Sequence, residues 1–267
     1  MATGKKWTRD ELLILLNIYH KLDFGQLDHR NKVIKEVAVA LGRTSSSVSM
    51  KLCNFAAFDP ALKLRGIKGL PGASKLDAEM WHEFSASPVE RIADSEDLLR
   101  DIFNAKENET VEVSKREGIR KIFTPKPPAN TESIANVKQR RGQDYFRAVV
   151  LNNYGEQCAV TRISVRELLV ASHILPWAAH PAHRLEVQNG ICLSRLHDAA
   201  FDIGLITFDD DLRLRLSTKL RGMLFGQKSL EQNFGIFEGE PLFLPDYGQP
   251  PLQSFLAWHR ENVFLKG

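Results

Sequence analysis

Three short stretches in the second half of the chain decide how its fold is interpreted. They read Ala-Ser-His-Ile-Leu-Pro-Trp at 171–177, Gln-Asn-Gly-Ile-Cys-Leu-Ser-Arg-Leu-His-Asp at 188–198 and Ala-Ala-Phe-Asp at 199–202. His173, Asn189 and His197 stand 16 and 8 residues apart, each at the edge of a short apolar run. The apolar runs predict two short strands, and the residues after the second run predict a helix. A histidine at the end of the first strand and another on the helix make a compact geometry for binding a metal.

The length, hydrophobic content and cysteine count limit the class of protein. A chain of 267 residues with 43% hydrophobic content suffices for one large domain or two. No apolar run reaches the ~18–20 residues of a membrane span, and no signal-peptide core follows the first methionine. Cys53, Cys158 and Cys192 are too few and too scattered for a disulfide framework, and they form no CxxC pair. We therefore expect a cytoplasmic protein with no membrane partner and no four-cysteine zinc site.

Charge is distributed unevenly along a chain whose formal net charge is +3. Residues 1–75 carry a net +7, residues 76–113 a net −8, residues 114–195 a net +7 and residues 196–267 a net −3. Two basic blocks separated by an acidic one indicate two units that face a polyanion, joined by an acidic connector. Solvated faces of uneven composition are the alternative that charge alone leaves open.

The first basic block, residues 1–75, contains patterns typical of three helices. Thr8 and Glu11 form a capping box that begins one helix, residues 31–41 predict a second, and residues 45–57 predict a third after a glycine-containing turn. Helix, turn and helix in this order are typical of a helix-turn-helix unit. The basic, glycine-rich loop at 59–75 suits a wing that contacts phosphates.

The third of these helices is the predicted DNA-reading element. It would expose small or hydrogen-bonding side chains that a major groove admits. An ordinary three-helix bundle with a polar outer face is the structural alternative. Two arginines later in the chain are further candidates for phosphate contacts. The predicted DNA-binding residues are Arg43, Ser45, Ser46, Ser49, Lys51, Asn54, Arg140 and Arg141.

The sequence predicts an α+β protein in three parts. Residues 1–85 form an all-α helix-turn-helix or winged-helix domain. Residues 86–130 form an acidic helical connector that ends in a proline-rich linker, because three prolines in four residues cannot continue a helix or a central strand. Residues 131–267 form the domain that contains the two strands and the helix, followed by a hairpin at 204–216.

The two histidines and the asparagine suit hydrolysis of a phosphodiester. That reaction needs a base that deprotonates water and a cation that neutralises charge on the phosphate oxygens. Histidine, with an unperturbed pKa of ~6.5, supplies a neutral base near neutral pH. An asparagine can orient that base or lend its carbonyl oxygen to a hard cation. A second histidine, on the following helix, can bind the metal.

Several segments of the chain, in this order, resemble the restriction-type form of the HNH endonuclease family. The resemblance spans roughly residues 135–265 and implies a ββα-metal fold for the C-terminal domain. It also implies a hydrolase that cuts double-stranded DNA. The matching segments are residues 140–147, 171–177, 189–193, 196–206 and 258–264.

The resemblance also implies a role for each residue of the motif. His173 would be the general base that activates water. Asn189 would hold the base-bearing loop or contact the metal. His197 would be a metal ligand, with Mg²⁺ the expected ion and Mn²⁺ or another divalent ion as alternatives.

One position departs from the pattern of the family. Many HNH enzymes place a metal-binding aspartate or histidine directly before the base, where this chain has Ser172, a weaker neutral ligand. The predicted metal ligands are therefore His197, Asn189 and Ser172, with water and the substrate phosphate. Asp198 or Asp202 would contribute only if the helix aimed it inward.

The function expected from these features is a metal-dependent, restriction-type DNA endonuclease used in defence. A single HNH unit cuts one strand at a time, so cutting both strands is easiest for a homodimer. A modified base is a candidate target by analogy with modification-dependent restriction proteins. One alternative is a DNA-binding regulator whose nuclease centre has decayed, which Ser172 favours and the intact histidines oppose. Another is an HNH toxin or homing nuclease.

Overall fold

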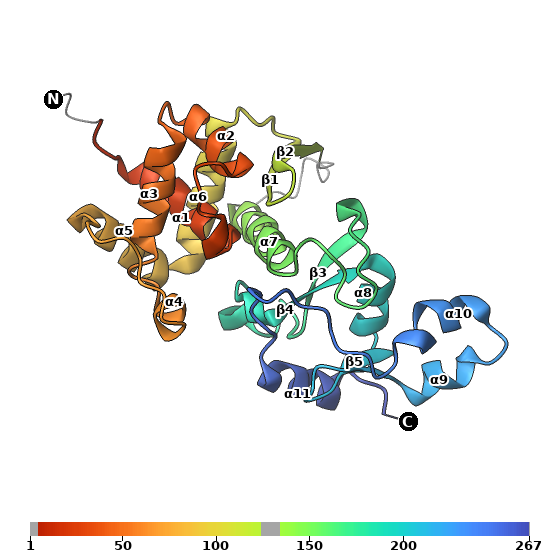
Figure 1. The fold of residues 1–267 in the computed structure, drawn as a ribbon. Helices are drawn as coiled ribbons and strands as arrows, with labels where there is room; N and C mark the ends of the chain where they lie inside the picture. Colours follow the sequence, from red (N-terminus) through yellow and green to blue (C-terminus); the bar gives the residue numbers. More distant parts are fainter. Residues whose placement is uncertain (1–4, 124–133, 267) are drawn as a thin grey trace. The chain divides into compact units, whose positions relative to one another are not determined.

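The chain folds into two compact units of α+β composition, divided between Ala148 and Val149 (Figure 1). The computed structural model describes residues 5–123 and 134–266. The linker predicted at 124–130 lies outside the described residues. Within the described residues, no helix is both long and apolar enough to cross a membrane.

The first unit is a helical bundle built around α1, whose residues from Glu11 to Tyr19 are all buried. Helices α3, α5 and α6 pack against it. The three helices predicted at the start of the chain are confirmed, and so is the capping box formed by Thr8 and Glu11. The unit contains α1 (Arg9–Lys21), α2 (Lys32–Ala40), α3 (Ser45–Phe55), α4 (Pro60–Leu64), α5 (Lys75–Ala86), α6 (Pro88–Ile102), β1 (Glu109–Ser114) and β2 (Gly118–Phe123).

The acidic segment predicted to be a connector is instead part of this bundle. Helix α6 packs on α1, and the buried Glu96 forms an ion pair with the buried Lys21. Asn17 donates hydrogen bonds to Ser95 and to Glu96, both at 2.8 Å. The acidic residues of α6 thus include one that neutralises an internal lysine. The antiparallel hairpin of β1 and β2, which follows α6, was not predicted from the sequence.

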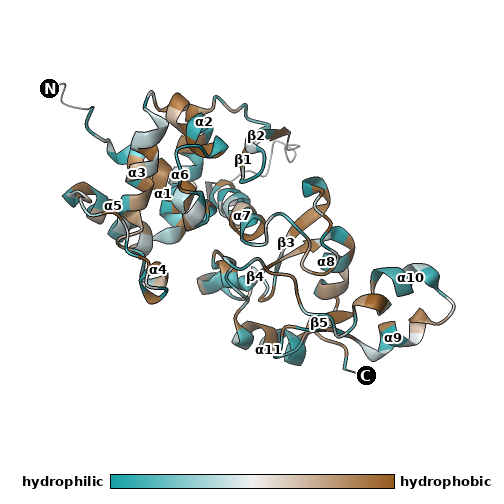
Figure 2. Cartoon of the chain, in the orientation of Figure 1, coloured by the Kyte–Doolittle hydropathy of each residue, from teal (hydrophilic) through white to brown (hydrophobic). Residues whose placement is uncertain are grey.

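Helix α7 (Ile134–Asn153) begins in the first unit and ends in the second. The second unit then contains β3 (Leu169–His173), β4 (Gly190–Ser194) and α8 (Arg195–Asp202), so the predicted two strands and helix are confirmed. Strand β3, which Figure 2 shows as largely hydrophobic, pairs antiparallel with β4. The remaining elements are β5 (Ile206–Phe208), β6 (Leu214–Leu216), α9 (Thr218–Leu224), α10 (Lys228–Asn233) and α11 (Gln253–Asn262).

Candidate active site

A cleft of about 470 Å³ lies between β3, the chain that follows it, and α8. All of its lining residues belong to the second unit. The lining residues are Val170, Ala171, Ser172, His173, Ile174, Pro176, Trp177, Asp198, Asp202, His259 and Val263.

The local fold explains why these residues meet. Strand β3 ends at His173, which pairs with Gly190 at the start of β4. The chain then passes directly from β4 into α8, where the Ser194 side chain caps the helix. Residues four apart share one face of a helix, so Asp198 and Asp202 line the cleft together.

His173 has the protonation state that a general base needs. Its Nε2 lies 3.1 Å from the carbonyl oxygen of Arg184, which can only accept, so Nε2 carries the hydrogen and Nδ1 the lone pair. Burial lowers the pKa of His173, so the ring is neutral at pH 7. The Trp177 ring packs edge-on against it, with centroids 5.3 Å apart. The predicted base therefore lines the cleft in a fixed orientation.

Asn189 has a structural position. It is fully buried, and its Oδ1 accepts a hydrogen bond from the backbone N–H of Leu175 at 2.8 Å. Its Nδ2 donates to the carbonyl oxygens of His183 at 3.0 Å and Leu175 at 3.4 Å. These bonds fix both ends of the long connection from β3 to β4. Of the two roles predicted for Asn189, the structure supports loop support and not metal ligation, because Asn189 does not line the cleft.

His197, the predicted metal ligand, does not line the cleft. The residue is buried, and its Nε2 donates to the carbonyl oxygen of Asn233 at 2.8 Å. Its Nδ1 lies 2.8 Å from Ser194 Oγ, and its ring packs on Phe234 at 4.9 Å between centroids. One residue along a helix is a rotation of about 100°, so the helix that turns Asp198 toward the cleft turns His197 toward α10.

The two aspartates of α8 take the place that His197 was predicted to fill. Desolvation, together with the neighbouring Asp198 carboxylate, raises the pKa of Asp202 to about 6, although part of the Asp202 side chain faces solvent. Burial also raises the pKa of Asp198, and the Ser172 hydroxyl opposes this shift. The sequence signal for this pair was its spacing of four residues, with the buried Phe201 between the two aspartates.

These residues fit a hard divalent cation. Mg²⁺ is commonly held by one or two carboxylates, with water and substrate phosphate oxygens completing its shell. Two crowded carboxylates supply that donor set. Ser172 Oγ is buried close to Asp198, yet it has no hydrogen-bond partner of normal geometry among the described residues. No group of three or more His, Cys, Asp or Glu side chains in the described ranges is placed to hold a metal.

His259 forms the back of the cleft, a position that its sequence context did not reveal. Its ring stacks on Phe201 with centroids 3.8 Å apart. Its Nε2 donates to the carbonyl oxygen of Phe201 at 3.1 Å, and its Nδ1 accepts from Thr207 Oγ1 at 2.9 Å. Burial lowers the pKa of His259 to about 4, so the ring stays neutral. His259 thus attaches α11 to the end of α8 beside Asp202.

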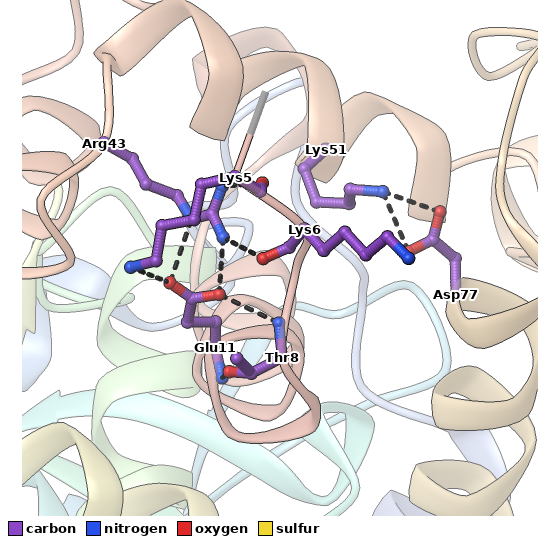
Figure 3. Close-up of polar contacts among 7 residues, drawn as sticks. All are labelled: Lys5, Lys6, Thr8, Glu11, Arg43, Lys51 and Asp77. Atoms are coloured by element: carbon purple, nitrogen blue, oxygen red, sulfur yellow. Dashed lines mark hydrogen bonds and ion pairs between the residues drawn. The ribbon is translucent and has the colours of Figure 1, made fainter. Parts of the chain in front are cut away.

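In the first unit, the predicted DNA contacts Arg43 and Lys51 are internal ion pairs (Figure 3). The Arg43 guanidinium donates to both Glu11 oxygens, at 2.6 and 2.9 Å, and stacks on the Trp7 ring at 3.6 Å. Lys51 Nζ donates to both oxygens of the fully buried Asp77, at 2.8 and 2.9 Å. Neither positive charge is presented to solvent, so the prediction that these side chains face DNA is wrong.

Of the other predicted DNA contacts, some have partners within the protein and one is exposed. Ser49 Oγ donates to the carbonyl oxygen of Leu27 at 2.5 Å, and Arg141 pairs with Asp97 at 2.6 Å. Ser46 is exposed. Ser45, Asn54 and Arg140 are half-buried, as are Ser49 and Arg141.

Replacing Lys51 with alanine is expected to destabilise the protein by about 3 kcal/mol, because it leaves the Asp77 carboxylate buried and unpaired. Chemical denaturation with a two-unit fit measures this effect. Lys75→Ala, which removes an exposed lysine at the start of α5, is the matched control and should change stability by less than about 0.5 kcal/mol. Equal stability of both variants would contradict the structural role of Lys51.

The side chains of the cleft and the elements that carry them indicate the class of protein. Two antiparallel strands and a helix bring a neutral histidine and two carboxylates together, which is an arrangement suited to metal-assisted phosphodiester hydrolysis. Residues 158–209 match the model of the HNH endonuclease family. The match covers β3, β4, α8 and β5. A search of curated proteins found no match.

Proposed function

We propose that this protein is a metal-dependent DNA endonuclease of restriction type. The observation that carries the proposal is the cleft of the second unit, where the neutral His173 and the carboxylates of Asp198 and Asp202 line the same space. A base without a cation site, or a cation site without a base, would suit binding rather than hydrolysis.

In the proposed reaction, Nδ1 of His173 accepts a proton from the attacking water. The Arg184 carbonyl oxygen holds the opposite side of the ring and stabilises the imidazolium that forms. The carboxylates of Asp198 and Asp202, beside Ser172, would hold a divalent ion. Such an ion, when bound, neutralises the charge that develops on the phosphate oxygens. The Phe201–His259 stack fixes the end of α8, so that the carboxylates stay aimed at the cleft.

Double-stranded DNA is the proposed substrate, and the first unit is proposed to help bind it. Because Arg43 and Lys51 are engaged internally, any DNA contact by this unit must use other cations. The end of α4 and the basic loop after it offer Lys63, Arg65 and Lys68, all of them exposed. A homodimer would place two centres on opposite strands, which fits cutting of both strands.

Incubation of supercoiled plasmid with the protein and Mg²⁺ or Mn²⁺ tests the proposal. We expect nicked and then linear DNA, and complete inhibition by a chelator. Plasmids that carry unmodified, methylated or hydroxymethylated cytosine, followed by sequencing of the ends, report whether a modified base is required. Failure to cut any of these substrates with either ion would overturn the proposal.

A further inference from the structure

A large aromatic side chain stands almost entirely in solvent on the nuclease unit. Phe225 is 98% exposed, more than any other large hydrophobic residue in the described part of the chain. It lies between α9 and α10, which pack against each other and form a helical projection beyond β5 (Figure 1). Covering an exposed phenylalanine removes its apolar surface from water, which favours a partner that binds over it.

The turn that carries Phe225 is built to present it. Gly226 has φ +78, a left-handed conformation that favours glycine, and a Cβ there would meet nothing within 4 Å. The helices on either side are anchored by buried residues, Leu220 in α9 and Phe234 after α10. The projection is therefore held at its base and open at its tip.

The projection and the strand that leads into it are basic, in a part of the chain that is acidic as a whole. Residues 212–230 contain five cations, Arg213, Arg215, Lys219, Arg221 and Lys228, and no acidic residue. Arg221 pairs with Glu238. Lys219 and Lys228 are exposed, and neither has an ion pair within the described residues. Figure 2 shows α10 as mostly hydrophilic, and the exposed Lys219 and Lys228 lie on either side of Phe225 in the sequence.

The projection is also connected to the helix that carries the proposed metal ligands. His197 of α8 donates to the carbonyl oxygen of Asn233, the last residue of α10, at 2.8 Å. Its ring packs on Phe234. DNA that contacts the projection would therefore be held by an element tied to Asp198 and Asp202, which gives the buried His197 a positioning role.

We propose that Phe225 is a wedge that inserts between base pairs of the DNA substrate, with Lys219 and Lys228 contacting the flanking phosphates. The occupant is duplex DNA, because it offers both a polyanionic surface for the cations and a stacked, apolar interior for the ring, and because it is the proposed substrate of the same unit. Inserted apolar side chains unstack base steps and unwind or kink the duplex. This inference rests on the proposed endonuclease function, since it takes the substrate from it.

Unwinding of plasmid DNA can be measured without knowing which sequence the protein recognises. The full-length protein carrying His173→Ala, which should bind without cutting, is added to nicked circular plasmid, and ligase then closes the circle. Insertion at each bound site should shift the topoisomer distribution. Adding Phe225→Ala should abolish the shift and weaken duplex binding, measured by fluorescence anisotropy, by about tenfold. Phe225→Trp should retain both.

Two further variants separate the wedge from general effects. Val165→Ala removes another exposed apolar side chain of the same unit and should change neither readout. Lys219→Ala with Lys228→Ala should lower the slope of log affinity against log salt by up to about 2, while a shift remains at low salt.

The outcomes are distinct. DNA binding and cutting with no topoisomer shift would overturn the wedge and leave the endonuclease intact. A protein that neither binds nor cuts DNA would overturn both. A Phe225→Ala protein that binds DNA normally but dissociates from dimer to monomer in sedimentation would show that the tip contacts a second copy of the chain, which also overturns the wedge.

Discussion

Replacing His173 with alanine is expected to slow DNA cleavage by about 10²–10⁴-fold, with little loss of DNA affinity. The reason is local, because Nδ1 is the nitrogen of the neutral ring that carries the lone pair. His173 is half-buried, and its contacts include one carbonyl oxygen and one tryptophan edge, so we expect its replacement to leave the strands intact. Single-turnover cleavage and anisotropy on the same duplex measure the two effects separately.

The pH dependence of cleavage provides a second readout for the same residue. Burial lowers the pKa of His173 below its ordinary value of 6.5, and the ring must be neutral to accept a proton. The rate should therefore fall on the acid side only below pH 6.5, as the ring becomes protonated. Added imidazole should partly restore the His173→Ala protein, because a small base can occupy the vacated space. Cleavage by that variant at the wild-type rate would contradict the role of His173 as the base.

Periodicity and turn chemistry were enough to predict the framework of this protein. The capping box at Thr8, the helix at 31–41 and the strand that ends at His173 all follow from local patterns, and all are confirmed. These features depend on residues close together in the sequence. The hairpin of β1 and β2 was missed because its alternation is short and lies next to a strongly helical, acidic segment.

The charged residues were harder to predict because their partners are remote in the sequence. The sequence predicted Lys51 to be an exposed helix residue, but in the structure it pairs with Asp77, which lies 26 positions away. The acidic excess of α6 similarly indicated a solvated connector, whereas Glu96 is buried against Lys21. Sequence alone gives the sign of a charge but not whether another element neutralises it.

The three residues that define the motif in the sequence have different positions in the structure. His173 lines the cleft, Asn189 fixes the loop, and His197 faces α10. The order of residues along the chain could not separate these roles, since the direction of a helical side chain depends on where the helix packs. The stack of Phe201 on His259, supplied by α11 more than fifty residues later, helps to set that direction.

Replacing both Asp198 and Asp202 with asparagine is expected to abolish metal-dependent cleavage and, at the same time, to stabilise the metal-free protein. Losing the proposed metal ligands should lower the apparent Mg²⁺ affinity by at least about 100-fold, the upper range seen for groups that only support such ligands. Mg²⁺ should raise the unfolding temperature of the native protein by mass action and leave that of the variant unchanged.

The gain in stability follows from the raised pKa values. In the folded protein the pKa of Asp202 is about 6, against an ordinary 3.8, so ionisation is disfavoured relative to the unfolded chain. The ionised carboxylate therefore costs stability above pH 6, and the cost disappears below pH 3.8, where the group is protonated in both states. The gain should be at most about 1 kcal/mol, because water screens a side chain that is partly exposed.

Two controls separate this account from the role first predicted for His197. Asp211→Asn removes an exposed carboxylate of the same unit and should alter neither metal response nor stability. His197→Gln should lower the unfolding temperature, because it disturbs the bond to Asn233, yet the protein should still be stabilised by Mg²⁺. A different result would place the metal on the other face of α8. It would be loss of the Mg²⁺ response in His197→Gln and its retention in the protein with both Asp198→Asn and Asp202→Asn. His197, and not the two aspartates, would then be assigned as the metal ligand.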